Sequence, residues 1–267
     1  MAEAPETAAL TADPAALALL LDLDGTLAPI IPDPDSVAIP PGIRTSLTQL
    51  VAGIGLVAFI SGRSLSDLRR IVGMTGVVYS GNHGTEIVDR DGMPIDAGLG
   101  DPEPLRAFAS HWGRADLGDR GIWLEDKGRT LTFHYRNATD PEAARAYLDE
   151  TAAPDGRRAG LRVEPGRMSL EVHPAGDSSK GTAVRAILDR ESAIRSAISV
   201  GDDRTDVTVW HMLDTLRAEG RLAGSLSVGV LSAETPPIVS ESADTLIEGV
   251  AGTERFLAAL VADLGRA

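Results

Sequence analysis

The order of apolar runs along the chain constrains its fold more than any other feature of the sequence. In the first hundred residues, strand-like runs such as LALLL (17–21) and GLVAFIS (55–61) alternate with helix-like segments at 41–51 and 64–72. Such alternation is typical of a parallel sheet with helices on both faces. The alternation resumes after residue 174, so we expect both ends of the chain to build one doubly wound α/β core.

A block of the sequence from residue 101 to 173 breaks this alternation. The strand-like runs IWLED and TLTFHYR follow one another directly, and LRVEP and MSLEVHP follow a helix-like segment at 141–152. Strands in direct succession favour antiparallel hairpins. We therefore predict three parts: a flexible leader (1–14), a core domain (15–100 and 174–267) and an inserted α/β cap domain (101–173).

Composition and charge exclude several classes of protein. A chain of 267 residues with 43% hydrophobic residues can form one large domain that carries a smaller one. Because it has no cysteine, it has no disulfide or thiolate metal site, which favours a cytoplasmic location. The acidic start lacks the basic residues of a signal peptide, and the longest early apolar run, AALALLL, is far shorter than the ~20 residues of a membrane span.

The formal net charge of −14 argues against a nucleic-acid partner, because affinity for a polyphosphate comes largely from clustered Lys and Arg. We also expect no membrane partner. An anionic ligand would have to be held by a few local positive groups that act against the overall field of the protein.

Polar residues follow several of the apolar runs, at positions where ligands bind in open parallel sheets. They are Asp22 and Asp24 after the first run, Ser61 after the second, Lys180 at the start of a helix, and Asp202, Asp203 and Asp206 after a later run. Several carboxylates without His or Cys form a hard oxygen site that suits Mg²⁺. A divalent cation also explains how Asp22 and Asp24 can share one strand end. The alternative is an acidic turn at the first strand and a capped helix after residue 203.

This set of groups allows phosphoryl transfer. One carboxylate of the Asp22 and Asp24 pair, held as an anion by the metal and Lys180, can attack phosphorus as a nucleophile. The other can protonate the leaving alkoxide and later take a proton from water. Phosphoryl transfer otherwise needs mainly positioning and charge neutralisation.

The segments DLDGT, SGR, the helix-opening Lys180 and GDDRTD, in this order, resemble the four motifs of the haloacid dehalogenase superfamily of aspartyl phosphatases. The resemblance implies that Asp22 is the nucleophile, that Asp24 is the acid/base and adds its backbone carbonyl to the metal, and that Ser61 and Lys180 hold the phosphate. It further implies that Asp202 is a metal ligand. It leaves open whether Asp203 or Asp206 reaches the Mg²⁺ ion directly or through water.

The insertion lies at the same place in the chain order as in a group of sugar phosphatases of this superfamily, which it resembles. A closer resemblance, to trehalose-6-phosphate phosphatases, is carried by the segments GNHG (81–84), EDKGRTLTFHYR (125–136) and PGRMSLEVHP (165–174). The substrate-binding residues implied by this resemblance are Arg63, Asn82, His83, Glu125, Lys127, Arg136, Arg167 and Glu171. Two positions differ from the family pattern. Arg167 stands where Lys is frequent, and His173 stands where Arg is common.

The resemblance implies a magnesium-dependent phosphatase that converts trehalose 6-phosphate to trehalose and phosphate through an aspartyl-phosphate. We also expect a monomer that is functionally coupled to a trehalose-phosphate synthase. Alternatives are a phosphatase of another sugar phosphate, such as sucrose 6-phosphate or a glucosylglycerate phosphate, and an inactive sugar-phosphate sensor or synthase partner domain. The presence of Asp22, Asp24 and Lys180 argues against an inactive protein. A signalling receiver domain would leave residues 101–173 unexplained.

Overall fold

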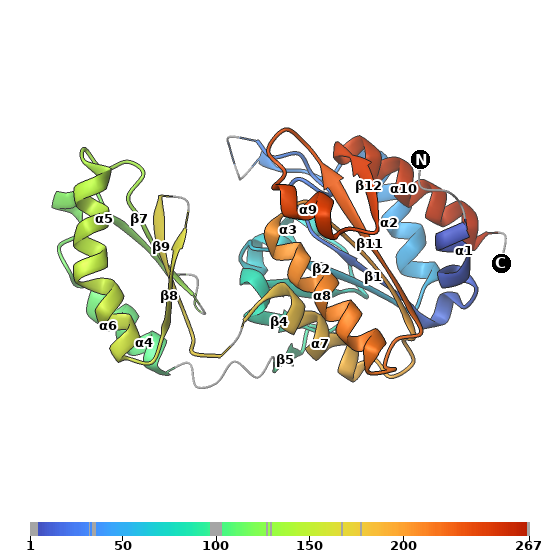
Figure 1. The fold of residues 1–267 in the computed structure, drawn as a ribbon, viewed down its shortest axis with the longest axis horizontal. Helices are drawn as coiled ribbons and strands as arrows, with labels where there is room; N and C mark the ends of the chain where they lie inside the picture. Colours follow the sequence, from blue (N-terminus) through green and yellow to red (C-terminus); the bar gives the residue numbers. More distant parts are fainter. Residues whose placement is uncertain are drawn as a thin grey trace. The chain divides into compact units, whose positions relative to one another are not determined.

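The structure, a computed structural model, describes residues 5–31, 33, 36–96, 103–126, 128, 130–166, 168–176 and 178–265. It contains two compact units, each with its own sheet (Figure 1). The core unit comprises Met1–Ala97 and Ser179–Ala267, and the inserted unit comprises Gly98–Ser178.

An eight-stranded sheet forms the centre of the core unit, in the order β12-β11-β10-β1-β2-β3-β4-β5. The strands are β1 (Leu17–Leu21), β2 (Leu56–Ile60), β3 (Val78–Gly81), β4 (Glu86–Val88), β5 (Pro94–Ile95), β10 (Ser196–Gly201), β11 (Gly224–Leu231) and β12 (Thr245–Glu248). All neighbours from β12 to β3 pair in parallel, which confirms the expected parallel sheet. Strands β4 and β5 extend it in antiparallel fashion.

Helices cover both faces of this sheet because its strands bury side chains on both sides. In β1, Leu17, Leu19 and Leu21 belong to one apolar cluster, while Ala18 and Leu20 belong to the other. The first cluster includes side chains of α1 (Pro5–Thr11), α2 (Pro41–Gly53), α3 (Leu65–Val72) and α10 (Gly249–Leu264). The second includes side chains of α7 (Lys180–Arg190), α8 (Arg204–Ala218) and α9 (Pro237–Ser242).

The strand register brings the carboxyl ends of three central strands together. Leu21, the last residue of β1, lies opposite Val200 of β10 and Phe59 of β2. The residues that directly follow these strands therefore emerge at one edge of the sheet, which is where ligands bind in folds of this kind.

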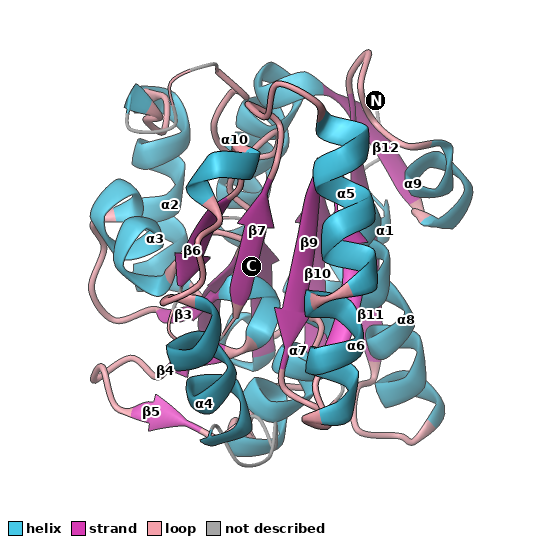
Figure 2. Ribbon diagram, turned by 90° about the vertical axis from the view of Figure 1, so that its left-hand side faces the viewer, coloured by secondary structure: helices cyan, strands magenta, loops and turns pink. Residues whose placement is uncertain are grey.

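The inserted unit is a four-stranded antiparallel sheet with helices on one face (Figures 1 and 2). Its strands, in the order β6-β7-β9-β8, are β6 (Trp123–Asp126), β7 (Leu131–His134), β9 (Ser169–His173) and β8 (Arg162–Gly166). Its helices are α4 (Glu103–Trp112), α5 (Pro141–Glu150) and α6 (Ala152–Arg158). Phe133 of β7 packs against Phe108 and Trp112 of α4, which places the core of this unit between the helices and one face of the sheet.

The prediction of a flexible leader is wrong for residues 5–14. Helix α1 packs against α10 and β11, and a 3₁₀ turn (Pro14–Ala16) leads into β1. Leu10 is buried in the core cluster, and the hydroxyl of Thr7 donates to the carboxylate of Asp263 over 3.1 Å. The helix is too short to show a clear period in the sequence, and the contacts that stabilise it come from the other end of the chain.

Other boundaries also differ from expectation. The segment 141–152 belongs to two helices, α5 and α6. Strands β4 and β5 were not expected, because two- and three-residue strands are too short to give a periodic pattern. Within the described part of the chain, no helix combines the length and apolar character needed to cross a membrane.

We expect Leu10→Ala to lower the free energy of unfolding by about 2 kcal/mol, or roughly 4–8 °C in Tm, because it leaves a cavity in the core. Thermal unfolding followed by circular dichroism measures this change. Ala9→Ser, at an exposed position of the same helix, is the matched control and should change Tm only slightly. Equal stability of Leu10→Ala and the unsubstituted protein would show that α1 does not contribute to the core.

Candidate active site

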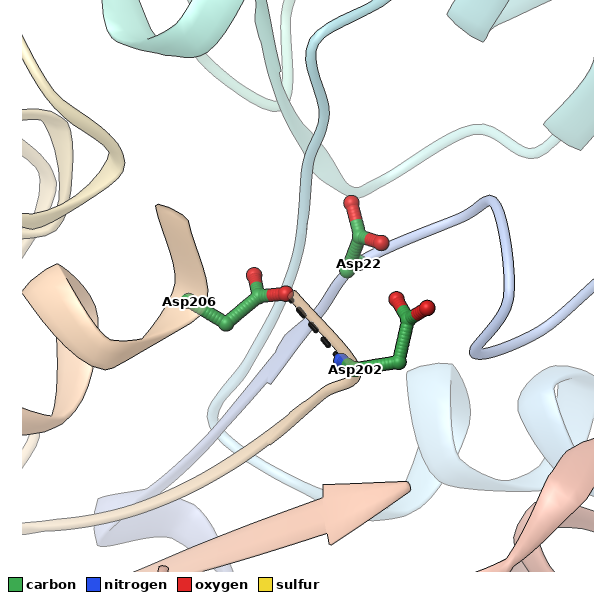
Figure 3. Close-up of side chains that lie close together, drawn as sticks. All are labelled: Asp22, Asp202 and Asp206. Atoms are coloured by element: carbon green, nitrogen blue, oxygen red, sulfur yellow. Dashed lines mark hydrogen bonds between the residues drawn. The ribbon is translucent and has the colours of Figure 1, made fainter. Parts of the chain in front are cut away.

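Three buried carboxylates meet at the carboxyl edge of the core sheet (Figure 3). Asp22, Asp202 and Asp206 each place a carboxylate oxygen within 4.8 Å of the others. The ammonium group of Lys180 lies among them, and its Nζ donates to Asp22 Oδ1 over 2.6 Å and to Asp206 Oδ1 over 2.8 Å. All four residues are at most 7% exposed. We refer to these four residues as the acidic cluster.

Each member of the cluster is positioned by a strand end or a helix start. Asp22 follows β1, and its backbone N–H donates to Val200 of β10 over 3.1 Å. Lys180 is the first residue of α7, where the Ser179 and Thr182 side chains form a capping box. Asp206 lies in the first turn of α8, and its Oδ2 accepts from the backbone N–H of Asp202.

The Gly-Thr pair behind Asp24 shapes the cluster. Gly25 has φ +79°, and a Cβ at this position would lie only 2.1 Å from Asp202 Oδ2. Only glycine therefore fits without displacing Asp202. The Thr26 hydroxyl donates to Asp202 Oδ1 over 3.3 Å. Both residues lie in the DLDGT segment, but the sequence does not indicate their roles, which depend on Asp202, 176 positions after Thr26.

Burial and mutual repulsion perturb the protonation of the cluster. Burial raises the pKa of Asp22 well above its usual range, and Asp206 and Asp202 raise it further, while Lys180 opposes the shift. Burial, followed by the charge of Asp206, raises the pKa of Asp202 to about 7. Burial alone would lower the pKa of Lys180, but Asp206 and Asp22 raise it, so the ammonium stays charged. When ionised, the carboxylates carry more negative charge than Lys180 can balance. This excess favours the binding of a proton or of a cation by the cluster.

Asp24 lies outside the acidic cluster and pairs with Arg63. The guanidinium Nε donates to Asp24 Oδ2 over 2.7 Å, and Nη2 donates to Oδ1 over 2.8 Å. Ser61, at the end of β2, is buried and its hydroxyl accepts from the backbone N–H of Arg63 over 3.2 Å. The loop after β2 thus connects Ser61 with the carboxylate of Asp24.

The GNHG segment adjoins this loop. The backbone N–H of Asn82 donates to Arg63, and that of His83 donates to Ser61. Asn82 and His83 both have positive φ, at 48° and 54°. Two consecutive non-glycine residues in this region are uncommon and indicate local strain, which is often found at functional sites.

The remaining predicted residues divide between exposed and partly buried positions. Asp203 is exposed and lies outside the acidic cluster. In the inserted unit, the His134 ring lies 2.8 Å from Glu125, and the His173 ring lies 3.4 Å from Glu171. Arg136 is exposed after β7. Lys127 and Arg167 lie outside the described residues.

Comparison with known proteins identifies the relatives of this chain. The family model described as trehalose-phosphatase matches residues 20–237. The chain belongs to the trehalose-phosphatase family. This match extends across both units and includes every residue of the acidic cluster.

Two curated members of the trehalose-phosphatase family differ in length. A trehalose-phosphate phosphatase of Mycobacterium ulcerans is 36% identical over 195 residues, which cover 71% of this chain and 49% of that protein. A probable trehalose-phosphate phosphatase of Sinorhizobium fredii is 33% identical over 261 residues, which cover 94% of this chain and 90% of that protein. The chain thus spans about half the length of the mycobacterial relative and most of the other.

Solved structures share the fold. The C-terminal domain of the C. albicans trehalose-6-phosphate phosphatase aligns with a TM-score of 0.71 and 22% identity, over 96% of this chain and 95% of that one. A trehalose-6-phosphate phosphatase related protein aligns with a TM-score of 0.70 and 21% identity, over 93% and 98%. Other neighbours include a haloacid dehalogenase-like hydrolase from Bacteroides thetaiotaomicron, with a TM-score of 0.62. This confirms the expected haloacid-dehalogenase-like fold.

The raised pKa of Asp202 predicts that, in the presence of a chelator, the protein loses stability as the pH rises. A carboxyl that titrates near 7 in the folded protein and near 3.8 in the unfolded chain stabilises the fold fully below pH 3.8. This contribution disappears as the pH rises through 7. We expect the fall in Tm between pH 5.5 and pH 8 to be smaller in Asp202→Asn, by the equivalent of about 1–3 kcal/mol.

The control for this experiment is Asp214→Asn, an exposed position of α8 that should follow the unsubstituted protein. Identical pH profiles of Asp202→Asn and Asp214→Asn would contradict the assigned shift.

Proposed function

We propose that this protein is a magnesium-dependent phosphatase that hydrolyses trehalose 6-phosphate through an aspartyl-phosphate. The observation that supports this most directly is the carboxylate of Asp22, buried at the end of β1 and hydrogen-bonded to Lys180, in a chain of the trehalose-phosphatase family. A carboxylate that is held by an ammonium group at the carboxyl edge of a sheet has the placement that a nucleophile needs.

The oxygen donors of the acidic cluster fit a magnesium ion. Both oxygens of Asp206 already accept hydrogen bonds, Oδ1 from Lys180 and Oδ2 from two backbone N–H groups. We therefore assign the ion to Asp22 and Asp202, and assign Asp206 the role of positioning Lys180. When bound, the ion would supply positive charge against the phosphate oxygens and the cluster carboxylates.

The covalent chemistry falls to two aspartates. An oxygen of Asp22 forms a bond to phosphorus while the bond from phosphorus to the sugar oxygen breaks, and Asp24 gives that oxygen a proton. Asp24 then takes a proton from water, which attacks phosphorus and releases Asp22 and phosphate. Both carboxylate oxygens of Asp24 accept hydrogen bonds from Arg63, so Arg63 competes with the sugar oxygen for contact with Asp24.

We propose that Lys180 and Ser61 hold the phosphate and that the inserted unit acts as the cap that recognises the sugar. Carboxylates such as Glu125 and Glu171 accept hydrogen bonds from sugar hydroxyls. Sites built from such bonds reject analogues that leave their polar groups unpaired. A cytoplasmic location, a monomeric state and functional coupling to a trehalose-phosphate synthase remain predictions from the sequence and the resemblance.

The direct test is phosphate release from trehalose 6-phosphate in the presence of Mg²⁺, with sucrose 6-phosphate and glucose 6-phosphate in parallel. We expect a strong preference for trehalose 6-phosphate. Asp22→Asn should lower kcat at least about a thousandfold, because the nucleophile is lost. Asp214→Asn is the control and should retain full activity. Preference for another sugar phosphate would overturn the substrate assignment, and retained activity of Asp22→Asn would overturn the nucleophile.

Glu125→Ala tests sugar recognition by the inserted unit. Loss of hydrogen bonds from a carboxylate to sugar hydroxyls should raise KM for trehalose 6-phosphate roughly tenfold. The small substrate p-nitrophenyl phosphate has no sugar, so its kinetics should change far less. Glu150→Ala, at an exposed position of α5, is the control. Equal losses of activity on both substrates would assign Glu125 to folding of the inserted unit.

A further inference from the structure

Trp123 is far more exposed than the other tryptophans of the protein. Its side chain lies on β6 and is 61% exposed, whereas the other two tryptophans, Trp112 and Trp210, are 5% and 1% exposed. Tryptophan buries much apolar surface when it packs in a core, so Trp123 contributes little to the core of the inserted unit, and the residues around it indicate what it could bind.

The ring of Trp123 stacks on a neighbouring aromatic ring. It stacks on the ring of His134, with centroids 4.9 Å apart and planes inclined by 19°. His134 in turn lies 2.8 Å from the carboxylate of Glu125. One face of the indole is therefore covered by His134, and the opposite face is available to a ligand without a large loss of side-chain entropy.

The sheet register assigns Trp123 to the face of the inserted sheet that carries no helices. Leu131 and Phe133 of β7 pack in the apolar cluster beneath the helices, so the alternate residues of β7 belong to the opposite face. Cross-strand pairing adds further members to this helix-free face, which includes Trp123, Glu125, Thr132, His134, Glu164, Ser169 and Glu171.

The chemistry of the helix-free face suits a neutral sugar better than a phosphate. Glu125, Glu164 and Glu171 are hydrogen-bond acceptors for hydroxyl groups, and Arg162, which the register adds to this face, is paired with Glu164 over 3.2 Å. Among the described residues this face therefore has more carboxylates than Lys and Arg side chains, which disfavours an anion. An aromatic ring beside such acceptors is the combination that orients an amphipathic ligand, whose polar groups bind at the rim and whose apolar face stacks.

We propose that Trp123 is a sugar-stacking residue, whose free indole face packs against the C–H face of a pyranose ring of the substrate. The negative face of an aromatic π-system attracts the weakly positive C–H groups, and the contact removes apolar surface from water. This inference rests on the proposed function for the identity of the sugar phosphate, and it assigns a specificity-determining residue to the inserted unit.

Fluorescence quenching tests the contact without turnover. In the Asp22→Asn protein with Mg²⁺, acrylamide should quench mainly Trp123, because Trp112 and Trp210 are buried. Trp123→Phe in the same background defines the signal of the two buried rings. We expect saturating trehalose 6-phosphate to lower the quenching constant at least about twofold, since a stacked sugar and His134 would then cover both faces.

Kinetics provide a second readout. Trp123→Ala should lower kcat/KM about tenfold more for trehalose 6-phosphate than for p-nitrophenyl phosphate, and Trp123→Phe should recover part of this loss, because a smaller ring still stacks. Met93→Ala, which removes an equally exposed side chain from the core unit, is the matched control and should leave the ratio unchanged. A purely structural role of Trp123 would lower activity on both substrates alike.

The outcomes separate this inference from the proposed function. Hydrolysis of trehalose 6-phosphate without protection of Trp123 would overturn the stacking role and leave the activity intact. Protection by sucrose 6-phosphate or glucose 6-phosphate, without hydrolysis of trehalose 6-phosphate, would support stacking and overturn the substrate assignment. Protection by none of the three would overturn the inference.

Discussion

The hydrogen-bonded ion pairs of Lys180 connect the fold of the core unit to its chemistry. The ammonium group is buried between the carboxylates of Asp22 and Asp206, at 2.6 and 2.8 Å, and so joins the ends of β1, α7 and α8. Moving a charge out of water costs several kcal/mol, and only good geometry and further hydrogen bonds compensate for it. The capping box at Ser179 and the backbone N–H groups that bind Asp206 provide that geometry. The residues that keep this edge of the sheet intact are thus the ones that hold the proposed nucleophile.

The topology explains how a second unit can be inserted without disturbing this arrangement. The parallel register of β10, β1 and β2 fixes the positions of Asp202, Asp22 and Ser61, and none of these contacts involves Gly98–Ser178. The inserted unit has its own apolar cluster between α4, α5, α6 and one sheet face. Its helix-free face can therefore change in sequence without loss of the core. If the inserted unit recognises the sugar as proposed, this separation would let its selectivity change while the edge of the core sheet is kept.

Most of the fold could be predicted from the sequence, because each central strand is a buried run followed by a charged or hydroxyl residue. What could not be predicted depends on contacts between distant residues. Helix α1 is stabilised by α10 at the other end of the chain, and β4 and β5 depend on pairing with β3. The spacing of Asp22 and Asp24 indicated a shared site, but it could not show that Arg63 would hold Asp24 through two hydrogen bonds. Similarly, only the geometry of α8 distinguishes the buried Asp206 from the exposed Asp203.

The two units differ in the charged groups that they offer to the proposed substrate. In the acidic cluster, three carboxylates face one ammonium, in a protein of net charge −14, so Lys180 alone cannot make this edge attractive to a phosphate. Burial, together with this excess of negative charge, raises the pKa of Asp202 to about 7. A divalent cation would relieve this excess and would supply the affinity for phosphate, so phosphate binding should depend on the cation. The helix-free face, with its carboxylates and Trp123, favours neutral hydroxyl-bearing rings instead. The two units therefore differ in the ligand chemistry that they favour, a phosphate with its cation at the core edge and neutral hydroxyl-bearing rings at the helix-free face.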